Sequence, residues 1–407
     1  MWRKNLFEVL RKAWRVIPFS IRRKSIFIAF ASKLVTLNNK IKVRRFFSKT
    51  SELSKAEQKL LKDNSTIISW PTYDWNIPLK QRPQHIAEEL AKIDGVQYLF
   101  CTKNYYDSLI GVKRLSQSLF LVNNFRKYSK LCKYVHVYAT DPNLTLRKFK
   151  KIEKLNKPII YEILDEIHED LQGRVSKSVI SRHNYALTSD KVQKIIVTAR
   201  NMEDKLPQNV RNKVTYIPNA CDPNHFLMQE IQNKNRVIGY FGALASWVDY
   251  ELISYLARRN PDWTIKLIGI DYDGSIWKSG VLSHENVRYL GVVDYQRLPS
   301  EIQFSVAILP FKINEITIST SPIKIYEYLA SGFPVVSTPL PECEAISHVS
   351  IGIGHKSFEE KIKSAILSDS TSYRATRRSF AMQQSWKARA TAYVVDFIDL
   401  EANKWQK

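Results

Sequence analysis

The chain has 407 residues, 44% of them hydrophobic and 25% charged, a composition that predicts a folded, soluble protein of two or three domains. Lys and Arg total 62 against 39 Asp and Glu, a formal net charge of +23, which points to an anionic partner such as nucleic acid, a membrane or a phosphorylated ligand. The four cysteines lie far apart without CxxC spacing. This spacing argues against a zinc site and a disulfide framework and favours a reducing cytosol.

The first 50 residues differ from the rest of the chain. They hold fourteen Lys and Arg side chains and one acidic side chain, Glu8. Apolar residues from Trp2 to Ile17 recur at three- and four-residue intervals with basic residues between them, which predicts a basic amphipathic helix ended by Pro18. Such a helix suits an anionic bilayer surface. The alternative is that its apolar stripe packs on the protein's own domain.

No run of residues approaches the ~18 apolar residues of a transmembrane helix. The N-terminus also lacks the long apolar core and the cleavage site of a signal peptide. We therefore expect a cytoplasmic protein that lies peripherally at the inner face of the cell membrane.

From about residue 65, short β-branched and aromatic runs alternate with helical stretches, which predicts an α/β protein with parallel sheets covered on both faces. In the first half, strands are predicted at 66–70, 97–101, 118–122, 134–139, 158–164, 194–198 and 214–217, with helices near 83–92 and 173–187. After the polar stretch 228–235, strands are predicted at 237–241, 265–268, 287–290, 306–310 and 334–337, with helices at 250–259 and 323–330. Two α/β domains therefore join near 225–235, and one further helix, 373–402, is available to pack back across both.

Several well-known catalytic motifs are missing from the sequence. There is no GxxxxGK[ST] phosphate loop and no GxGxxG, so ATPase and dehydrogenase functions lose their main support. There is also no HExxH or GxSxG, which leaves a zincin or an elbow-type serine hydrolase unsupported.

The segment 321–337 is the most informative block. It predicts a helix with Ser321 as N-cap and Pro322 at the first helical position, followed by a turn at Gly332 and a buried strand. Lys324 and Glu327 lie three residues apart and so share one helical face near the N-terminus. Backbone N–H groups and a lysine there can receive an anion, and the carboxylate can accept hydroxyls. An ordinary surface Lys–Glu pair is the alternative.

This block resembles the C-terminal signature P-x-K-x-x-E-Y-x-A-x-G-x-P-V-V of the group 1 glycosyltransferases, family 4 of the GT-B fold. Other segments are similar to the family in the same order. They are the interdomain I-P-N segment at 214–222 with Phe226, the first strand and loop of the donor domain at 239–249, its second strand at 261–269, the N-V-x-x-x-G segment at 286–291, and, for a bacterial surface-polysaccharide subgroup, the first acceptor-domain helix at 82–87. The similarity covers about residues 65–400.

The resemblance implies two Rossmann-like domains facing a cleft. The acceptor-side domain would span 65–225 and the donor nucleotide-sugar domain 236–372, with 373–402 packing back across them. The expected activity moves a sugar from a nucleotide-sugar donor to a lipid-linked or cell-surface polysaccharide precursor, with retention of configuration and without a metal or other cofactor. A catalytically inactive scaffold is one alternative. A nucleic-acid-binding protein is another, but the excess charge is concentrated in 1–50 and no nucleic-acid module is recognisable.

On the donor side, the resemblance implies that Glu327 holds the nucleotide ribose. Lys324 is our candidate for stabilising the leaving diphosphate, as a catalytic and donor-binding residue, because the loop 243–249 lacks the basic residue that many members place there. Gly242, Ser319 and Ser321 complete the predicted donor-binding set. Ser319 stands where the family often has the first of two glutamates.

On the acceptor side, Asp165 and His85 are the predicted catalytic residues. Asp165 lies in the acidic stretch 164–170 just after a strand, at the edge where α/β sheets bind ligands. A solvated helix start or a metal cluster are alternatives for that stretch, and structural capping is the alternative for His85. Arg82 and Trp75 are the predicted acceptor-side residues, although core packing explains Trp75 equally well.

Overall fold

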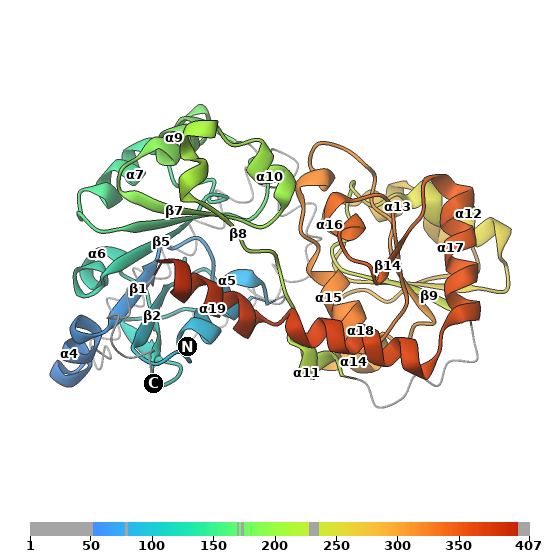
Figure 1. Ribbon diagram of the computed structural model, residues 1–407, viewed down its shortest axis with the longest axis horizontal. Helices are drawn as coiled ribbons and strands as arrows, with labels where there is room; N and C mark the ends of the chain where they lie inside the picture. Colours follow the sequence, from blue (N-terminus) through green and yellow to red (C-terminus); the bar gives the residue numbers. More distant parts are fainter. Residues whose placement is uncertain (1–51, 78–79, 169–170, 172–174, 228–235, 398–407) are drawn as a thin grey trace, which may run out of the picture.

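The structure is a computed structural model that describes residues 52–77, 80–168, 171, 175–227 and 236–397. The predicted basic amphipathic helix in 1–50 lies outside the described residues. Two domains lie side by side, each built on its own sheet (Figure 1). Within the described residues, no helix is both long enough and apolar enough to cross a membrane.

The first domain contains an eight-stranded sheet in the order β3-β4-β2-β1-β5-β6-β7-β8. All neighbouring strands are parallel except β3 and β4, which pair antiparallel at one edge. The strands are β1 Ser65–Ser69, β2 Val96–Cys101, β3 Val112–Arg114, β4 Leu119–Val122, β5 Tyr134–Tyr138, β6 Ile159–Ile163, β7 Val192–Val197 and β8 Val214–Tyr216. Most are buried along their whole length, as parallel strands covered on both faces must be.

Helices cover both faces of this sheet, and each face has its own hydrophobic cluster. These helices are α4 Lys55–Asp63, α5 Arg82–Leu90, α6 Phe125–Tyr128, α7 Leu146–Glu153, α9 Lys177–Thr188 and α10 Arg200–Asp204. In Figure 1, α7, α9 and α10 lie on one face and α5 on the other.

The second domain contains a six-stranded, all-parallel sheet in the order β11-β10-β9-β12-β13-β14. Its strands are β9 Val237–Phe241, β10 Thr264–Ile268, β11 Val287–Tyr289, β12 Val306–Leu309, β13 Val335–Ser337 and β14 Val349–Ile351. Its helices are α11 Pro223–Phe226, α12 Tyr250–Arg259, α13 Ser275–Lys278, α14 Leu298–Glu301, α15 Ile323–Ser331, α16 Pro341–Glu344 and α17 Gly354–Ser368. A single large apolar cluster forms the core of this domain.

The predicted single C-terminal helix is wrong in one respect, because the described part of it forms two helices, α18 Thr371–Gln383 and α19 Trp386–Phe397. The helix breaks at Gln384 and Ser385, where the backbone pairs with Cys221 instead of continuing the helical bonds: Cys221 N–H donates to the Gln384 carbonyl at 3.1 Å and Trp386 N–H to the Cys221 carbonyl at 3.2 Å. Before the break, α18 packs on α15 in the second domain, and after it α19 returns to α5 in the first (Figure 1).

Candidate active site

The start of α15 places the predicted donor residues. The prediction that Ser321 caps this helix is wrong: Pro322 occupies the cap position and no side chain caps the helix. The Ser321 hydroxyl instead accepts a hydrogen bond from the backbone N–H of Asn219 at 3.1 Å. The helix ends, as predicted, at Gly332, whose φ of 87° suits glycine.

Lys324 lies directly against Gly242, the residue that follows β9. Gly242 has φ of 145°, and its N–H donates to the Ile268 carbonyl at 2.8 Å. A Cβ built at Gly242 would stand 1.8 Å from Lys324 Cε, so the lysine can lie across the end of β9 only because residue 242 is glycine. The loop that follows β9 and the start of α15, both predicted from the sequence to bind the donor, therefore meet.

The charge of Lys324 acts on two carboxyl groups, those of Glu327 and Asp165. Burial raises the pKa of Glu327 to about 7, although Lys324 opposes the shift. Burial likewise raises the pKa of Asp165 to about 6, again against Lys324. Burial lowers the pKa of Lys324, and both carboxyl groups counteract this. Asp165 follows β6 of the first domain, so the two domains together supply a cation and two carboxyl groups. The lysine can bind an anionic group of a ligand, and the carboxyl groups can accept hydrogen bonds from hydroxyl groups of the same ligand.

Ser319 joins the two domains in the described structure. Its side chain is fully buried, and its hydroxyl accepts from Asn201 Nδ2 at 2.6 Å and from Lys205 Nζ at 3.0 Å. Lys205 also donates to Glu166 at 2.7 Å. Asn201 and Lys205 could not be predicted from the sequence, because more than a hundred residues separate them from Ser319 and no motif marks them.

Tyr295 is a third residue of this region that was not predicted from the sequence. Its ring stacks on His225 with centroids 4.2 Å apart. Its hydroxyl is buried and has no hydrogen-bond partner among the described residues. Burial raises the pKa of this hydroxyl well above its ordinary value, and the charge of Glu327 adds to the shift. Tyr295 therefore brings a buried hydroxyl without a hydrogen-bond partner into the electrostatic surroundings of Glu327.

The other predicted acceptor-side residues make contacts within the protein. His85 stacks on Trp386 of α19 with centroids 4.8 Å apart, and burial lowers the pKa of His85 to about 3, so the ring is neutral at pH 7. Trp75 makes an edge contact with Phe100 at 5.1 Å. Within the described residues, neither side chain hydrogen-bonds to the Lys324, Glu327 and Asp165 group. Arg82 is only 2% exposed, and its partners are described below.

The acidic stretch after β6 is described only in part, since 169–170 are outside the described residues. Over the residues that the structure does describe, no three His, Cys, Asp or Glu side chains are grouped so that they could hold a metal ion.

Two Rossmann-like domains, joined by a crossover segment and bridged by C-terminal helices, define the GT-B fold, and comparison with solved structures agrees. Sucrose-phosphate synthase from Thermosynechococcus elongatus superimposes with a TM-score of 0.62 at 12% identity, over 81% of this chain and 97% of that one. HepE from Anabaena, solved in complex with UDP-glucose, gives a TM-score of 0.58 at 14% identity, over 81% and 98%. The chain therefore has the fold of group 1-like GT-B glycosyltransferases.

Comparison with known sequences matches a smaller part of the chain. No model of a known protein family matches the chain. The chain is 32% identical over 107 residues to TuaH of Bacillus subtilis, whose name proposes a glycosyltransferase of teichuronic acid biosynthesis. The match covers 26% of this chain and only 27% of TuaH.

Proposed function

We propose that this protein is a glycosyltransferase that moves a sugar from a nucleotide-sugar donor to a lipid-linked or cell-surface polysaccharide precursor. The observation that carries the proposal is the packing of Lys324 against Gly242, with Glu327 one helical turn further on. Asp165 of the first domain acts electrostatically on the same lysine. HepE, which shares the fold, is solved with UDP-glucose. The names of TuaH and of WaaG, a glycosyltransferase involved in lipopolysaccharide biosynthesis with a TM-score of 0.52, support the proposed acceptor class.

In the proposed reaction, Lys324 and the N-terminal amides of α15 stabilise the negative charge that develops on the leaving diphosphate. Glu327, once ionised, accepts hydrogen bonds from the nucleotide ribose. Asp165 lies on the acceptor side, and its raised pKa of about 6 suits a group that holds or takes the proton of the attacking hydroxyl. We propose that the reaction retains the configuration of the sugar and uses no metal, as the resemblance implies.

The test is a thermal-shift screen of the purified full-length chain against a panel of nucleotide sugars, in buffer that contains EDTA. A ligand that binds only the native state at a hundred times its Kd stabilises it by about 2.7 kcal/mol. We expect one nucleotide sugar to raise the Tm and to be consumed when an acceptor is added. A shift with duplex DNA alone would instead favour the nucleic-acid alternative, and binding without transfer would favour an inactive scaffold. Activity that needs added Mg²⁺ would contradict the metal-free reaction.

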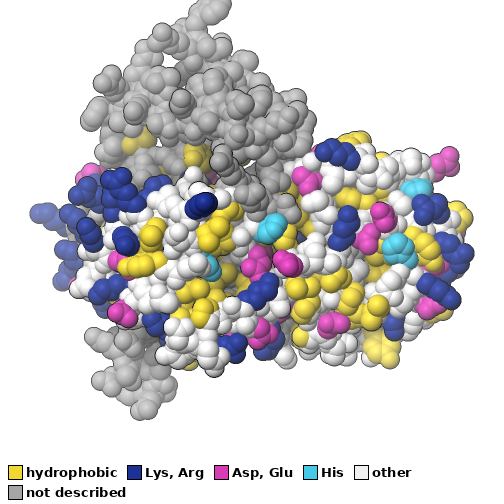
Figure 2. Space-filling view, turned by 90° about the horizontal axis from the view of Figure 1, so that it is seen from above, with side chains coloured by type: hydrophobic (Ala, Val, Ile, Leu, Met, Phe, Trp, Pro, Cys, Tyr) yellow, Lys and Arg dark blue, Asp and Glu magenta, His cyan; other side chains and the backbone are white. Residues whose placement is uncertain are grey.

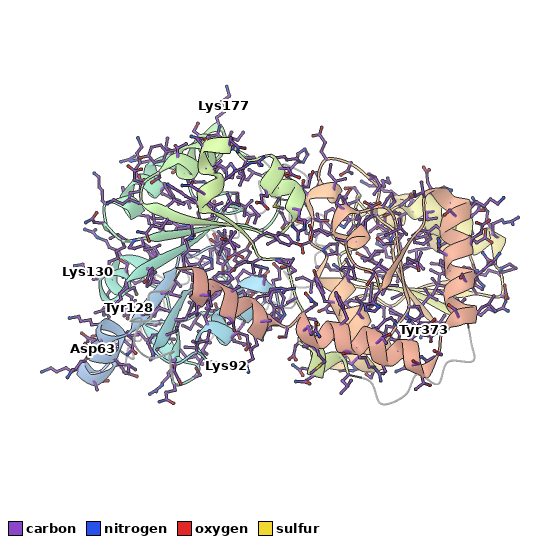
Figure 3. The ribbon with its side chains drawn as sticks, in the orientation of Figure 1. Asp63, Lys92, Tyr128, Lys130, Lys177 and Tyr373 are labelled. Atoms are coloured by element: carbon purple, nitrogen blue, oxygen red, sulfur yellow. The ribbon has the colours of Figure 1, made fainter. Side chains whose placement is uncertain are left out.

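We also propose that the protein works peripherally at the inner face of the cell membrane. Beyond the basic residues of 1–50, the exposed face of α7 carries Arg147, Lys148, Lys150 and Lys151. Figure 2 shows Lys and Arg side chains gathered at the end of the molecule formed by the first domain, and Figure 3 shows Lys177 pointing outward from the start of α9. Each basic side chain near an anionic bilayer contributes up to ~1 kcal/mol.

Binding of the full-length protein to lipid vesicles should therefore rise with the fraction of anionic lipid and weaken in 1 M salt, where the Debye length falls to ~3 Å. Deletion of residues 1–50 should reduce binding in a co-sedimentation assay but spare transfer to a water-soluble acceptor. If the full-length protein does not bind anionic vesicles, the membrane proposal is wrong. If the deletion unfolds the protein, 1–50 is part of the domain packing.

A further inference from the structure

The crossover between the two domains, residues 217–221, is held by two arginines from different parts of the chain. Arg82 of α5 donates through Nη1 to the Pro218 carbonyl at 2.8 Å. Arg389 of α19 donates through Nε to the same carbonyl at 3.1 Å and through Nη2 to the Asn219 carbonyl at 3.2 Å. The position of the crossover is therefore set by side chains and not only by its own backbone.

Asn219 connects this crossover to the donor helix. Its side-chain oxygen accepts from Arg82 Nη1 at 3.2 Å. Its side-chain nitrogen donates to the Ser321 carbonyl at 2.6 Å, and its backbone N–H donates to the Ser321 hydroxyl. Ser321 lies two residues before the first residue of α15, and Lys324 is the second residue of that helix. A continuous series of hydrogen bonds thus runs from Arg82 through Asn219 to Ser321, and the chain leads from Ser321 directly into the helix that carries Lys324.

Arg82 is itself firmly fixed. Its Nε pairs with Glu162 of β6, and its Nη2 donates to the Tyr393 hydroxyl of α19 at 3.2 Å. Glu162 is fully buried and also bonds His136 Nε2 at 2.6 Å. Burial opposes the ionisation of Glu162, but Arg82 and His136 outweigh it and hold the pKa of Glu162 at about 2. The Arg82–Glu162 pair therefore stays charged at any physiological pH.

We infer that Arg82 is a positioning residue of the donor site, which acts through Asn219 and Ser321 on the start of α15 and does not touch a substrate. Each of the three guanidinium nitrogens already has a partner within the protein, and the side chain is buried. The role is distinct from the acceptor contact that the sequence suggests for Arg82. The expected change in donor KM rests on the proposed function. The expected effect of Arg82 on the start of α15 does not.

The kinetic test compares Arg82→Lys, Asn219→Ala and the double variant, with Arg236→Lys as a matched control whose exposed pair with Asp262 belongs to neither site. Each single variant should raise the donor KM about tenfold, the effect of ~1.4 kcal/mol, and leave the acceptor KM unchanged. Because both residues act through one series of bonds, the double variant should also lose about tenfold and not about a hundredfold. A raised acceptor KM with an unchanged donor KM would overturn the inference.

Hydrogen exchange provides a readout that does not depend on activity. In Arg82→Lys and in Asn219→Ala, peptides that cover 320–330 should exchange faster than in the wild type, and peptides of β9 and β10 should not. Faster exchange in a protein that binds no nucleotide sugar would refute the proposed function but leave standing the coupling of Arg82 to the start of α15. Asn219 is half-buried in a loop, so its variant keeps the test decisive if Arg82→Lys fails to fold. Unchanged exchange in a folded variant would overturn the inference.

Discussion

Replacement of Lys324 by methionine should lower the rate of sugar transfer roughly ten- to hundredfold and leave the protein folded. Methionine fills the space against Gly242 but removes the positive charge from the end of β9. The loss of a charge-assisted contact costs about 1.5–3 kcal/mol, which is one to two decades in rate. The helix itself is held by the buried side chains of Ile325, Tyr328 and Leu329.

The measurement is steady-state transfer from the nucleotide sugar found in the thermal-shift screen, together with the Tm of each variant. Lys356→Met is the matched control, because Lys356 is exposed at the start of α17. Wild-type turnover in Lys324→Met would remove Lys324 from the site.

Replacement of Glu327 by glutamine should stabilise the free protein at pH 8 and weaken donor binding. The folded protein raises the pKa of this carboxyl from 4.5 to about 7, so the native state binds the proton more tightly than the unfolded chain. The free energy of unfolding therefore falls as the pH rises from about 4.5 to about 7, by a total of about 3 kcal/mol. Glutamine has nearly the same shape and no ionisation cost, but it forms weaker hydrogen bonds with ribose hydroxyls.

The comparison is between the Tm of Glu327→Gln and of the wild type at pH 4.5 and at pH 8, with donor affinity from calorimetry at pH 8. The variant should match the wild type at the lower pH and exceed it at the higher one, while its donor affinity falls about tenfold. Equal Tm values at pH 8 would show that Glu327 ionises freely in the folded protein. Glu360→Gln, an exposed change in α17, should alter neither quantity.

The sheets could be predicted from the sequence because their strands are buried on both faces. Segments such as β4 and β12 are continuous apolar runs. Each of the twelve strands predicted from the sequence is present, with ends that differ by at most two residues. The strands that the pattern did not reveal, β3 and β14, have three residues each. β3 also lies at a sheet edge with two of its three side chains exposed, so it lacks the buried pattern.

The candidate site could be predicted only where its residues are close in the sequence. Lys324 and Glu327 are three residues apart on one helix, and the resemblance marked both. The partners of Ser321 and Ser319 could not be found in this way, since Asn219 and Lys205 lie more than a hundred residues away. The break after α18 was missed because neither Gly nor Pro marks it, and the structure accounts for it through pairing with Cys221.

The pairing of Cys221 with the break between α18 and α19 has a mechanical consequence. The chain crosses between the domains twice, at 217–221 and at 384–386, and the two crossings are hydrogen-bonded to each other. Two adjacent attachments favour rotation about one hinge axis and resist sliding and twisting. Opening about this axis would also have to break the contacts of Ser319 with Asn201 and Lys205, which join the domains outside the two crossings. The bonds from Asn219 to Ser321 lie at the axis itself, so the start of α15 keeps its place whether the domains are open or closed.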